Sequence, residues 1–416
     1  MTIAKNRWYN YLIMKKKSVW VKKRHNTIRH LVEKPIYRYL KKNYGFSYTP
    51  FDTNGQAYLI LANHQTAMDQ FIVQLPFKDY CYPIASEDIF SIALGKAIAW
   101  AVAPIPITKG QINVNTILTC KQIAKQNKSI QLHPEGNRTY SGKTEYIAPA
   151  IAKLAKVLKL PIAFLVIRGG YGVRPRWSEK PRKGQCHAKV ESVLLPEQYL
   201  SMTDEELYKQ ICQRLYVNES NDNGETFDGD TLAEYLERAI YYCPNCGVTH
   251  FYSNKNSFKC TTCDLQVIYQ PNKQFATNDG SAPPYRNVNE WYEAQKSYVC
   301  KFVPTDCNQI ITQDKAKISK VILMKRKQKL CSLLELTLYP NRLVAVGKNY
   351  SFDKSFDDQI TGMSVLGKNK LNIICKEEVL QIEGDKRFNA LKYANFFYRY
   401  KNFKEGKNDI SQFLGL

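Results

Sequence analysis

The chain carries a histidine and an aspartate at a spacing that suits proton transfer. His64 follows the apolar run 59–62 and Asn63, and Asp69 stands five residues further on. An apolar run bounded by polar residues predicts a buried strand that ends in a turn. A neutral imidazole can take a proton from a hydroxyl, and a carboxylate on its other nitrogen fixes the tautomer and stabilises the imidazolium. These residues predict a general base, His64, oriented by Asp69, although two polar residues that merely share a turn would show the same spacing.

A second stretch adds groups that could bind an anion. The block Pro134-Glu135-Gly136-Asn137-Arg138 follows the short apolar segment 129–132. Glycine lets the backbone come close to a ligand, and the guanidinium of Arg138 offers a planar fork that suits phosphate. Together, the two stretches favour an active site over a chance spacing.

The two stretches resemble motifs of the glycerolipid acyltransferase family, which includes 1-acylglycerol-3-phosphate O-acyltransferases. The family has His-x-x-x-x-Asp, present here from His64 to Asp69, and Pro-Glu-Gly-x-Arg, present from Pro134 to Arg138. Two looser blocks agree in order and spacing: 104–109, a short strand with the basic residue Lys109, and 160–166, an apolar strand led by proline. The resemblance covers roughly residues 48–217.

The resemblance implies an acyl transfer without a covalent acyl-enzyme. His64 would remove the proton from a glycerol hydroxyl of a lysophospholipid, 1-acylglycerol-3-phosphate, and the alkoxide would attack the thioester of acyl-CoA or acyl carrier protein to give phosphatidic acid. The substrate-binding residues carried over are Asn63, Lys109, Glu135, Gly136 and Arg138. Three departures concern the acceptor: His133 stands where the family has Phe, Asn137 stands where Thr is common, and 168–175 differs from the usual close of the fourth block. Another glycerolipid acceptor stays open as an alternative.

The length of 416 residues indicates several domains, because one small core cannot hold a chain of this size. Between 48 and 217, apolar segments at 57–62, 82–85, 105–107, 129–132 and 162–167 predict short strands that alternate with helix-like segments. This alternation predicts an α/β sandwich around a mostly parallel sheet. The family resemblance implies the same fold. The expected divisions are a basic segment 1–47, an acyltransferase domain 48–217, a linker 218–235, a zinc ribbon 236–275, a second linker 276–310 and a β-rich domain 311–416.

Four of the 12 cysteines form two Cys-x-x-Cys pairs, Cys243 with Cys246 and Cys260 with Cys263. Two such pairs separated by thirteen residues supply four thiolates at the spacing of a tetrahedral structural zinc. The sequence therefore predicts one Zn²⁺ in a zinc ribbon of about thirty residues, which is too small to bury a core of its own. The other cysteines are expected to be buried thiols without disulfides.

The last hundred residues contain short, often alternating apolar runs that are broken by turn residues such as Pro340-Asn341 and 367–369. One helix follows, with Phe388, Leu391 and Tyr398 on one face. Six or seven strands and a terminal helix resemble a barrel of the pleckstrin-homology or GRAM type. This resemblance depends on element order and turn chemistry, without an identifying motif.

The charge of the chain points to an anionic partner. Its net charge is +23 with a pI near 9.4, and residues 1–50 hold thirteen Lys or Arg and one Glu. Basic residues mixed with Trp, Leu and Ile at helical intervals are typical of an interfacial membrane helix. No run of 18 apolar residues is free of charges, and the N-terminal residues lack the pattern of a secretory signal. We therefore expect a peripheral protein on the cytoplasmic face of the cell membrane.

A different class of function also accounts for the charge and the cysteines. A zinc-ribbon protein could use the basic arm to contact DNA or RNA. That reading gives no role to His64, Asp69, Glu135 and Arg138, so we expect no nucleic-acid partner. A comparison of the protein's binding to liposomes and to oligonucleotides would separate the two hypotheses. The sequence does not indicate the oligomeric state.

Overall fold

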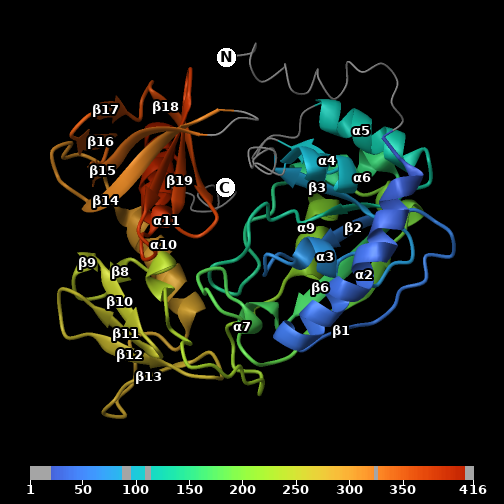
Figure 1. Ribbon diagram of the computed structural model, residues 1–416, viewed down its shortest axis with the longest axis horizontal. Helices are drawn as coiled ribbons and strands as arrows, with labels where there is room; N and C mark the ends of the chain where they lie inside the picture. Colours follow the sequence, from blue (N-terminus) through green and yellow to red (C-terminus); the bar gives the residue numbers. More distant parts are fainter. Residues whose placement is uncertain (1–19, 87–94, 108–113, 323–326, 408–416) are drawn as a thin grey trace.

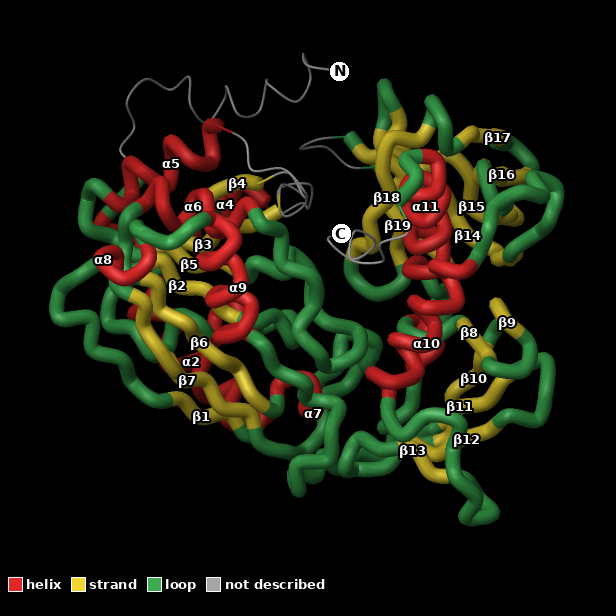
Figure 2. Tube along the Cα trace, turned by 180° about the vertical axis from the view of Figure 1, so that it is seen from behind, coloured by secondary structure: helices red, strands yellow, loops and turns green. Residues whose placement is uncertain are grey.

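The computed structural model describes residues 20–86, 95–107, 114–322 and 327–407, which form two lobes (Figure 1). The first lobe holds the N-terminal α/β part of the chain. The second lobe, from about residue 230 onward, holds two groups of strands with a helix between them (Figure 2).

The first lobe is built on a seven-stranded sheet. Its strands in spatial order are β1 (Phe46–Tyr48), β7 (Cys186–Leu194), β6 (Ile162–Arg168), β2 (Leu59–Ala62), β5 (Ile130–Leu132), β3 (Tyr82–Ser86) and β4 (Ile105–Ile107). Neighbouring strands are parallel except for β6 and β7, which pair antiparallel. The mixed α/β fold expected from the alternating pattern is confirmed, and β2 lies near the centre of the sheet.

Helices cover both faces of this sheet. They are α2 (Lys23–Tyr44), α3 (Asp69–Ile72), α4 (Gly95–Val102), α5 (Val114–Ala124), α6 (Ala150–Leu158), α7 (Gly170–Val173), α8 (Pro196–Tyr199) and α9 (Asp204–Leu215). Leu59 and Leu61 of β2 belong to one buried cluster with α5, α6 and α9. Ile60 and Ala62 belong to a second cluster with α2 and α3. Because alternate residues of a strand face opposite sides, both faces of β2 are buried in a three-layer sandwich.

Helix α2 lies within the basic segment expected at 1–47, and it is packed against the sheet. Leu40 and Tyr44 are 0% exposed. The helix ends at Gly45, whose φ of 55° is left-handed and whose N–H donates to the carbonyl of Leu40. A Cβ on Gly45 would lie 2.0 Å from the carbonyl oxygen of Gly184, so only glycine fits there. Among the described helices, none has the length and apolar character needed to cross a membrane.

The second lobe begins with small strands that carry the cysteine pairs. They are preceded by η2 (Leu236–Arg238) and comprise the hairpin β8 (Tyr242–Cys243) and β9 (Gly247–Val248), and the antiparallel sheet β10 (Phe251–Asn254), β11 (Ser257–Cys260), β12 (Gln266–Tyr269) and β13 (Phe275–Ala276). Helix α10 (Val288–Lys301) follows inside 276–310, which the sequence suggested to be a linker. Asn287 caps this helix through the N–H of Glu290, and Val288, Trp291 and Tyr292 are buried.

The C-terminal part is a seven-stranded antiparallel sheet with one helix packed on it. Its strands in spatial order are β17 (Phe352–Ser355), β16 (Arg342–Gly347), β15 (Gln328–Leu338), β14 (Thr312–Val321), β20 (Val379–Gly384), β19 (Lys370–Cys375) and β18 (Ile360–Leu366). Helix α11 (Ala390–Lys404) packs against β18 and β19. Among the described pairings, β17 and β18 do not meet, so a curled half-barrel is compatible with the sheet.

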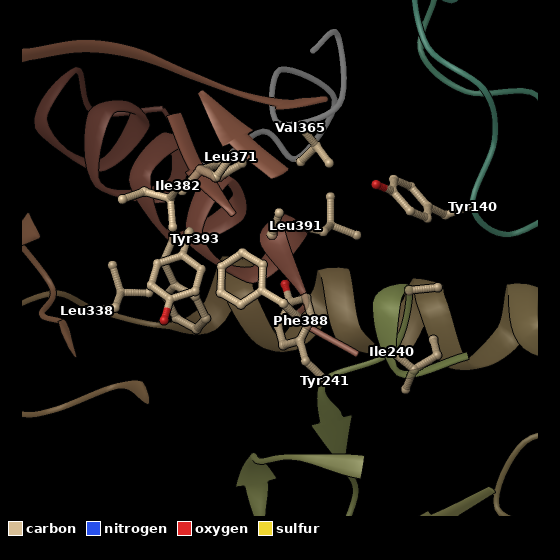
Figure 3. Close-up of a cluster of buried hydrophobic side chains, with 14 of the residues drawn as sticks. Tyr140, Ile240, Tyr241, Leu338, Val365, Leu371, Ile382, Phe388, Leu391 and Tyr393 are labelled. Atoms are coloured by element: carbon tan, nitrogen blue, oxygen red, sulfur yellow. The ribbon is translucent and has the colours of Figure 1, made fainter. Parts of the chain in front are cut away.

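One hydrophobic core runs through the whole second lobe. Its buried side chains come from the cysteine-bearing strands, α10, the C-terminal sheet and α11, and they include Tyr140 of the first lobe (Figure 3). Trp291 of α10 lies 5.7, 5.5 and 5.5 Å from the rings of Phe251, Phe258 and Phe275. The expected zinc ribbon therefore shares a core with α10, because its few apolar residues find their partners outside the unit.

Candidate active site

The carboxyl end of β2 presents the imidazole of His64. Its Nδ1 lies 2.8 Å from Oδ2 of Asp69, which is the first residue of α3. The side chain of His64 is 18% exposed, whereas Asp69 is 0% exposed. The strand, the turn and the helix thus bring together the two residues that the sequence singled out.

The carboxylate of Asp69 is held by the turn that connects His64 to Asp69. Its Oδ2 accepts the N–H groups of Gln65 at 2.6 Å and Thr66 at 2.8 Å. The hydroxyl of Thr66 donates to Oδ1 at 2.6 Å. Burial raises the pKa of Asp69, but the hydrogen bond and charge of His64 and the Thr66 hydroxyl outweigh it, so that the pKa is lowered. Asp69 is therefore an ionised acceptor for the imidazole.

Burial keeps the imidazole of His64 neutral. It lowers the pKa of His64 to about 4, with a further contribution from the neighbouring His133, against the opposing effect of Asp69. A neutral ring that donates its Nδ1–H to Asp69 carries its lone pair on Nε2. His64 can accept a proton at Nε2.

His133 stacks on the ring of His64. The two ring centroids are 4.3 Å apart and the planes differ by 17°. Nδ1 of His133 lies 3.1 and 2.9 Å from the carbonyl oxygens of Ala62 and Asn63, so Nδ1 carries the proton. Burial lowers the pKa of His133. The sequence showed only that His133 differs from the family pattern, whereas in the structure its ring covers one face of the His64 imidazole.

Glu135 and Asn63 hold the main chain around the site. The two carboxylate oxygens of Glu135 accept the N–H groups of His64 and Glu145, each at 2.7 Å. Burial raises the pKa of Glu135, against the effect of the two N–H donors. The side-chain amide of Asn63 pairs with the N–H and carbonyl of Ile167 at 2.8 and 2.9 Å. These contacts favour positioning roles over the direct substrate contact expected from the sequence.

Arg138 places a cation near the base. Gly136, with a φ of 68°, makes the tight turn that leads to it. Within the ranges that the structure describes, the guanidinium of Arg138 forms no hydrogen bond or ion pair. Burial and the nearby Arg176 lower the pKa of Arg138 to about 10, and its charge acts on His64 and Asp69. Because a half-buried guanidinium without a partner is costly, the site favours an anion there. Lys109, the other basic residue expected here, lies outside the described residues.

Comparison with family models matches residues 32–168 to the family described as acyltransferase. This segment is similar to acyltransferases. The acyltransferase-like segment contains both His64 and Arg138. Among solved structures, the 1-acyl-sn-glycerophosphate (LPA) acyltransferase PlsC from Thermotoga maritima is similar at 18% identity and a TM-score of 0.37, over 50% of this chain and 86% of that chain. The comparison with curated proteins gave no match.

The four cysteines of the second lobe lie together, outside the acyltransferase-like segment. Sγ of Cys243 is 3.7 Å from Sγ of Cys263, and Sγ of Cys260 is 4.0 Å from that of Cys246. All four sulfurs lie within 4.8 Å of one another. A tetrahedral zinc with bonds of about 2.3 Å needs sulfurs about 3.8 Å apart, so these residues fit that ion.

His64, Asp69 and His133 also bring three possible metal ligands within 4.8 Å of one another. In this group, however, Oδ2 of Asp69 already accepts three N–H donors, from His64, Gln65 and Thr66. Nδ1 of His133 is directed at two carbonyl oxygens. The arrangement is therefore a hydrogen-bonded base.

Proposed function

We propose that the protein transfers a fatty acyl group from acyl-CoA or acyl carrier protein to the hydroxyl of a lysophospholipid, 1-acylglycerol-3-phosphate, to give phosphatidic acid. The observation that carries this proposal is the neutral His64, bonded to Asp69, beside the guanidinium of Arg138, which has no partner among the described residues. A base and an anion-binding group together suit a hydroxyl-bearing phosphate ester. The similarity of residues 32–168 to acyltransferases supports the reaction type.

The reaction follows from these positions. Nε2 of His64 takes the proton of the acceptor hydroxyl while Asp69 stabilises the imidazolium that forms. The alkoxide attacks the thioester carbonyl, and the carbon–sulfur bond then breaks. The thiolate leaves and receives the proton from His64, which restores the neutral base. Glu135 and Asn63 hold the main chain so that this geometry is preformed.

An acyl-transfer assay tests the proposal. Purified protein is offered labelled acyl-CoA or acyl carrier protein with lysophosphatidate, other lysolipids or monoacylglycerol. We expect labelled phosphatidic acid as the main product. Transfer to a different glycerolipid would keep the reaction and change the acceptor, whereas no transfer to any of these acceptors would reject the function.

Replacement of Arg138 should affect binding of the acceptor more than turnover. We expect Arg138→Ala to raise KM for lysophosphatidate about 10-fold or more, because a charge-assisted phosphate contact contributes about 1.5–3 kcal/mol in ground and transition state alike. Steady-state kinetics with lysophosphatidate and with monoacylglycerol measure this. The matched control is Lys209→Ala, whose exposed partner is Glu205. An unchanged KM for lysophosphatidate would mean that another residue binds the phosphate.

The basic N-terminal part is proposed to bind the anionic cytoplasmic face of the cell membrane. Exposed basic residues of α2 include Lys34, Arg38, Lys41 and Lys42. Leu31 of α2 is 71% exposed and Trp100 of α4 is 59% exposed, with Arg24 lying 5.1 Å from the Trp100 ring. Exposed apolar side chains beside basic ones support attachment at the interface.

Removing these charges should weaken attachment to membranes. Because α2 is packed against the sheet, the change combines deletion of residues 1–19 with Gln at the four exposed basic positions 34, 38, 41 and 42. We expect weaker and less salt-sensitive binding to anionic liposomes, at about 1 kcal/mol per charge near the surface. The control places Gln at four exposed lysines of the second lobe: Lys329, Lys348, Lys376 and Lys386. Equal liposome binding by both variants, or preferential binding of oligonucleotides, would contradict the membrane role.

The four clustered cysteines are proposed to bind one structural Zn²⁺ as thiolates. The support is the mutual distance of their sulfurs, with Cys243 and Cys263 at 3.7 Å. Four sulfur ligands close the coordination shell and leave no position for water. The zinc would therefore stabilise the fold, and the chemistry at His64 would proceed without it.

A further inference from the structure

The segment 174–182 of the first lobe is held by the second lobe. It starts six residues after the acyltransferase-like match ends. Nζ of Lys368, in the turn between β18 and β19, donates to the carbonyl of Ser178 at 2.6 Å and lies 2.8 Å from a carboxylate oxygen of Glu179. Arg238 donates to the carbonyl of Trp177 at 2.9 Å and pairs with Glu179 at 2.7 Å. Two cations of the second lobe thus converge on Glu179.

Arg176 continues this connection to the active site. Its side chain is buried, at 5% exposure. Nη1 donates to the carbonyl of Arg138 at 3.0 Å, and Nη2 donates to the carbonyl of Val365 in β18 at 3.4 Å. The guanidinium lies 4.1 Å from the ring centroid of Tyr140. One planar fork therefore joins the main chain of Arg138 to the C-terminal sheet, which a lysine could not do with the same geometry.

The loop that follows Arg138 is docked on the second lobe as well. Tyr140 is 5% exposed and points into the core of that lobe, near Val365 (Figure 3). Its ring stacks on Tyr292 of α10 at 6.3 Å. Lys143 pairs with Glu293 of the same helix at 3.3 Å.

The same loop is tied to the base at its other end. The N–H of Thr139 donates to the carbonyl of His64 at 2.9 Å. The peptide group that joins Arg138 to Thr139 therefore makes two contacts: its N–H donates to the carbonyl of His64, and its carbonyl accepts from Arg176, which also bonds the second lobe. Since the guanidinium of Arg138 has no partner within the described residues, its direction depends on how its main chain is held.

We propose that the second lobe positions Arg138 for the anionic group of the acceptor, with Arg176 as the positioning residue. This inference rests on the proposed function. The second lobe supports the acceptor site at two points: the carbonyl of Val365 in β18 accepts a hydrogen bond from Arg176, and Tyr140 is buried in the core of the second lobe. A phosphate-bearing acceptor depends on this support, whereas an acceptor without phosphate does not.

A double-mutant cycle between Arg176 and Arg138 tests the proposal. Arg176→Lys keeps the charge and loses the fork, and Arg176→Met also removes the charge. We expect both to raise KM for lysophosphatidate about 3- to 30-fold, in the range of couplings between residues in one network. kcat and KM for monoacylglycerol should change less than about 2-fold. In the Arg138→Ala background, Arg176→Lys should have no further effect, because it acts through Arg138.

The controls separate positioning from folding and from the proposed function. Arg286→Lys makes the same exchange at an exposed arginine that pairs with Glu290 of its own helix region, so it should leave KM unchanged. Thermal unfolding of each variant reports its stability. The dissociation constant of lysophosphatidate, measured without an acyl donor, gives the coupling between Arg138 and Arg176 independently of acyl transfer. Equal KM changes for both acceptors, or additive effects of the two substitutions on binding, would overturn the proposal. If binding of lysophosphatidate shows this coupling between Arg138 and Arg176, but the wild-type protein transfers no acyl group, only the proposed function is rejected.

Discussion

His64→Ala should lower acyl transfer about 10²–10⁴-fold, the range of a lost general base. Asp69→Asn should cause a loss in the same range. The amide cannot stabilise an imidazolium as a carboxylate does, and its N–H₂ group conflicts with the N–H donors of Gln65 and Thr66 that now face Oδ2. His64 acts on the reacting hydroxyl and Asp69 acts through His64, so kcat should fall and KM should change little.

The measurement is kcat and kcat/KM in a cell-free assay with a soluble short-chain acceptor. His187→Ala is the matched control, because His187 bonds Ser47 and Thr49 at the edge of the sheet. Since burial lowers the pKa of His64 to about 4, the base stays neutral and kcat/KM should hold level from about pH 8 down to about pH 5. Activity should fall only as the pH approaches 4. Near-wild-type turnover by His64→Ala would refute the mechanism.

The sequence predicted the catalytic pair because its geometry is local. His64 and Asp69 are five residues apart, so one strand end and one turn are enough to join them. The contacts of His133 and Glu135 with the same turn span about 70 residues. These contacts depend on β5 pairing beside β2, which no local pattern encodes. Their residues were visible in the sequence, but their positioning roles were not.

The strands of the first lobe show the same limit. The expected strands at 57–62, 82–85, 105–107, 129–132 and 162–167 correspond to β2, β3, β4, β5 and β6. β1 and β7 were not expected. β7 is the second strand from one edge of the sheet, and it contains Lys189 and Glu191, so its apolar pattern is weak. Its position is set by its pairing with β1 and β6.

The connection between the lobes was also beyond the sequence pattern. α10 lies where a linker was expected, and Arg176 lies beyond the matched motifs. The partners of Arg176 are the carbonyls of Arg138 and Val365. Every residue carries a main-chain carbonyl, so the sequence does not indicate which carbonyls accept these hydrogen bonds. A cluster of this kind is recognised only after the chain is folded.

Zinc removal should have the second large effect, on the folding of the cysteine-bearing unit. We expect one Zn²⁺ per chain by elemental analysis, lost in Cys260→Ser and retained in the matched variant Cys307→Ser, whose thiol is exposed. In zinc-finger peptides the metal contributes about 10–16 kcal/mol of apparent binding free energy, so its loss should unfold the unit. Packing of Phe251 and Phe258 on Trp291 should leave part of this core in place.

Transfer at His64 should continue after zinc removal, at an unchanged or reduced rate on soluble substrates. Tyr269 of the cysteine-bearing unit lies 5.8 Å from Trp177, in the segment that carries Arg176. Loosening of that contact should therefore raise KM for lysophosphatidate and leave monoacylglycerol transfer nearly unchanged.

The acyl-transfer assay is run before and after chelation and again after zinc is restored. Absence of zinc from the purified protein would reject the ribbon. Complete, zinc-restorable loss of transfer to both acceptors, with the first lobe still folded, would instead place the metal in the chemistry.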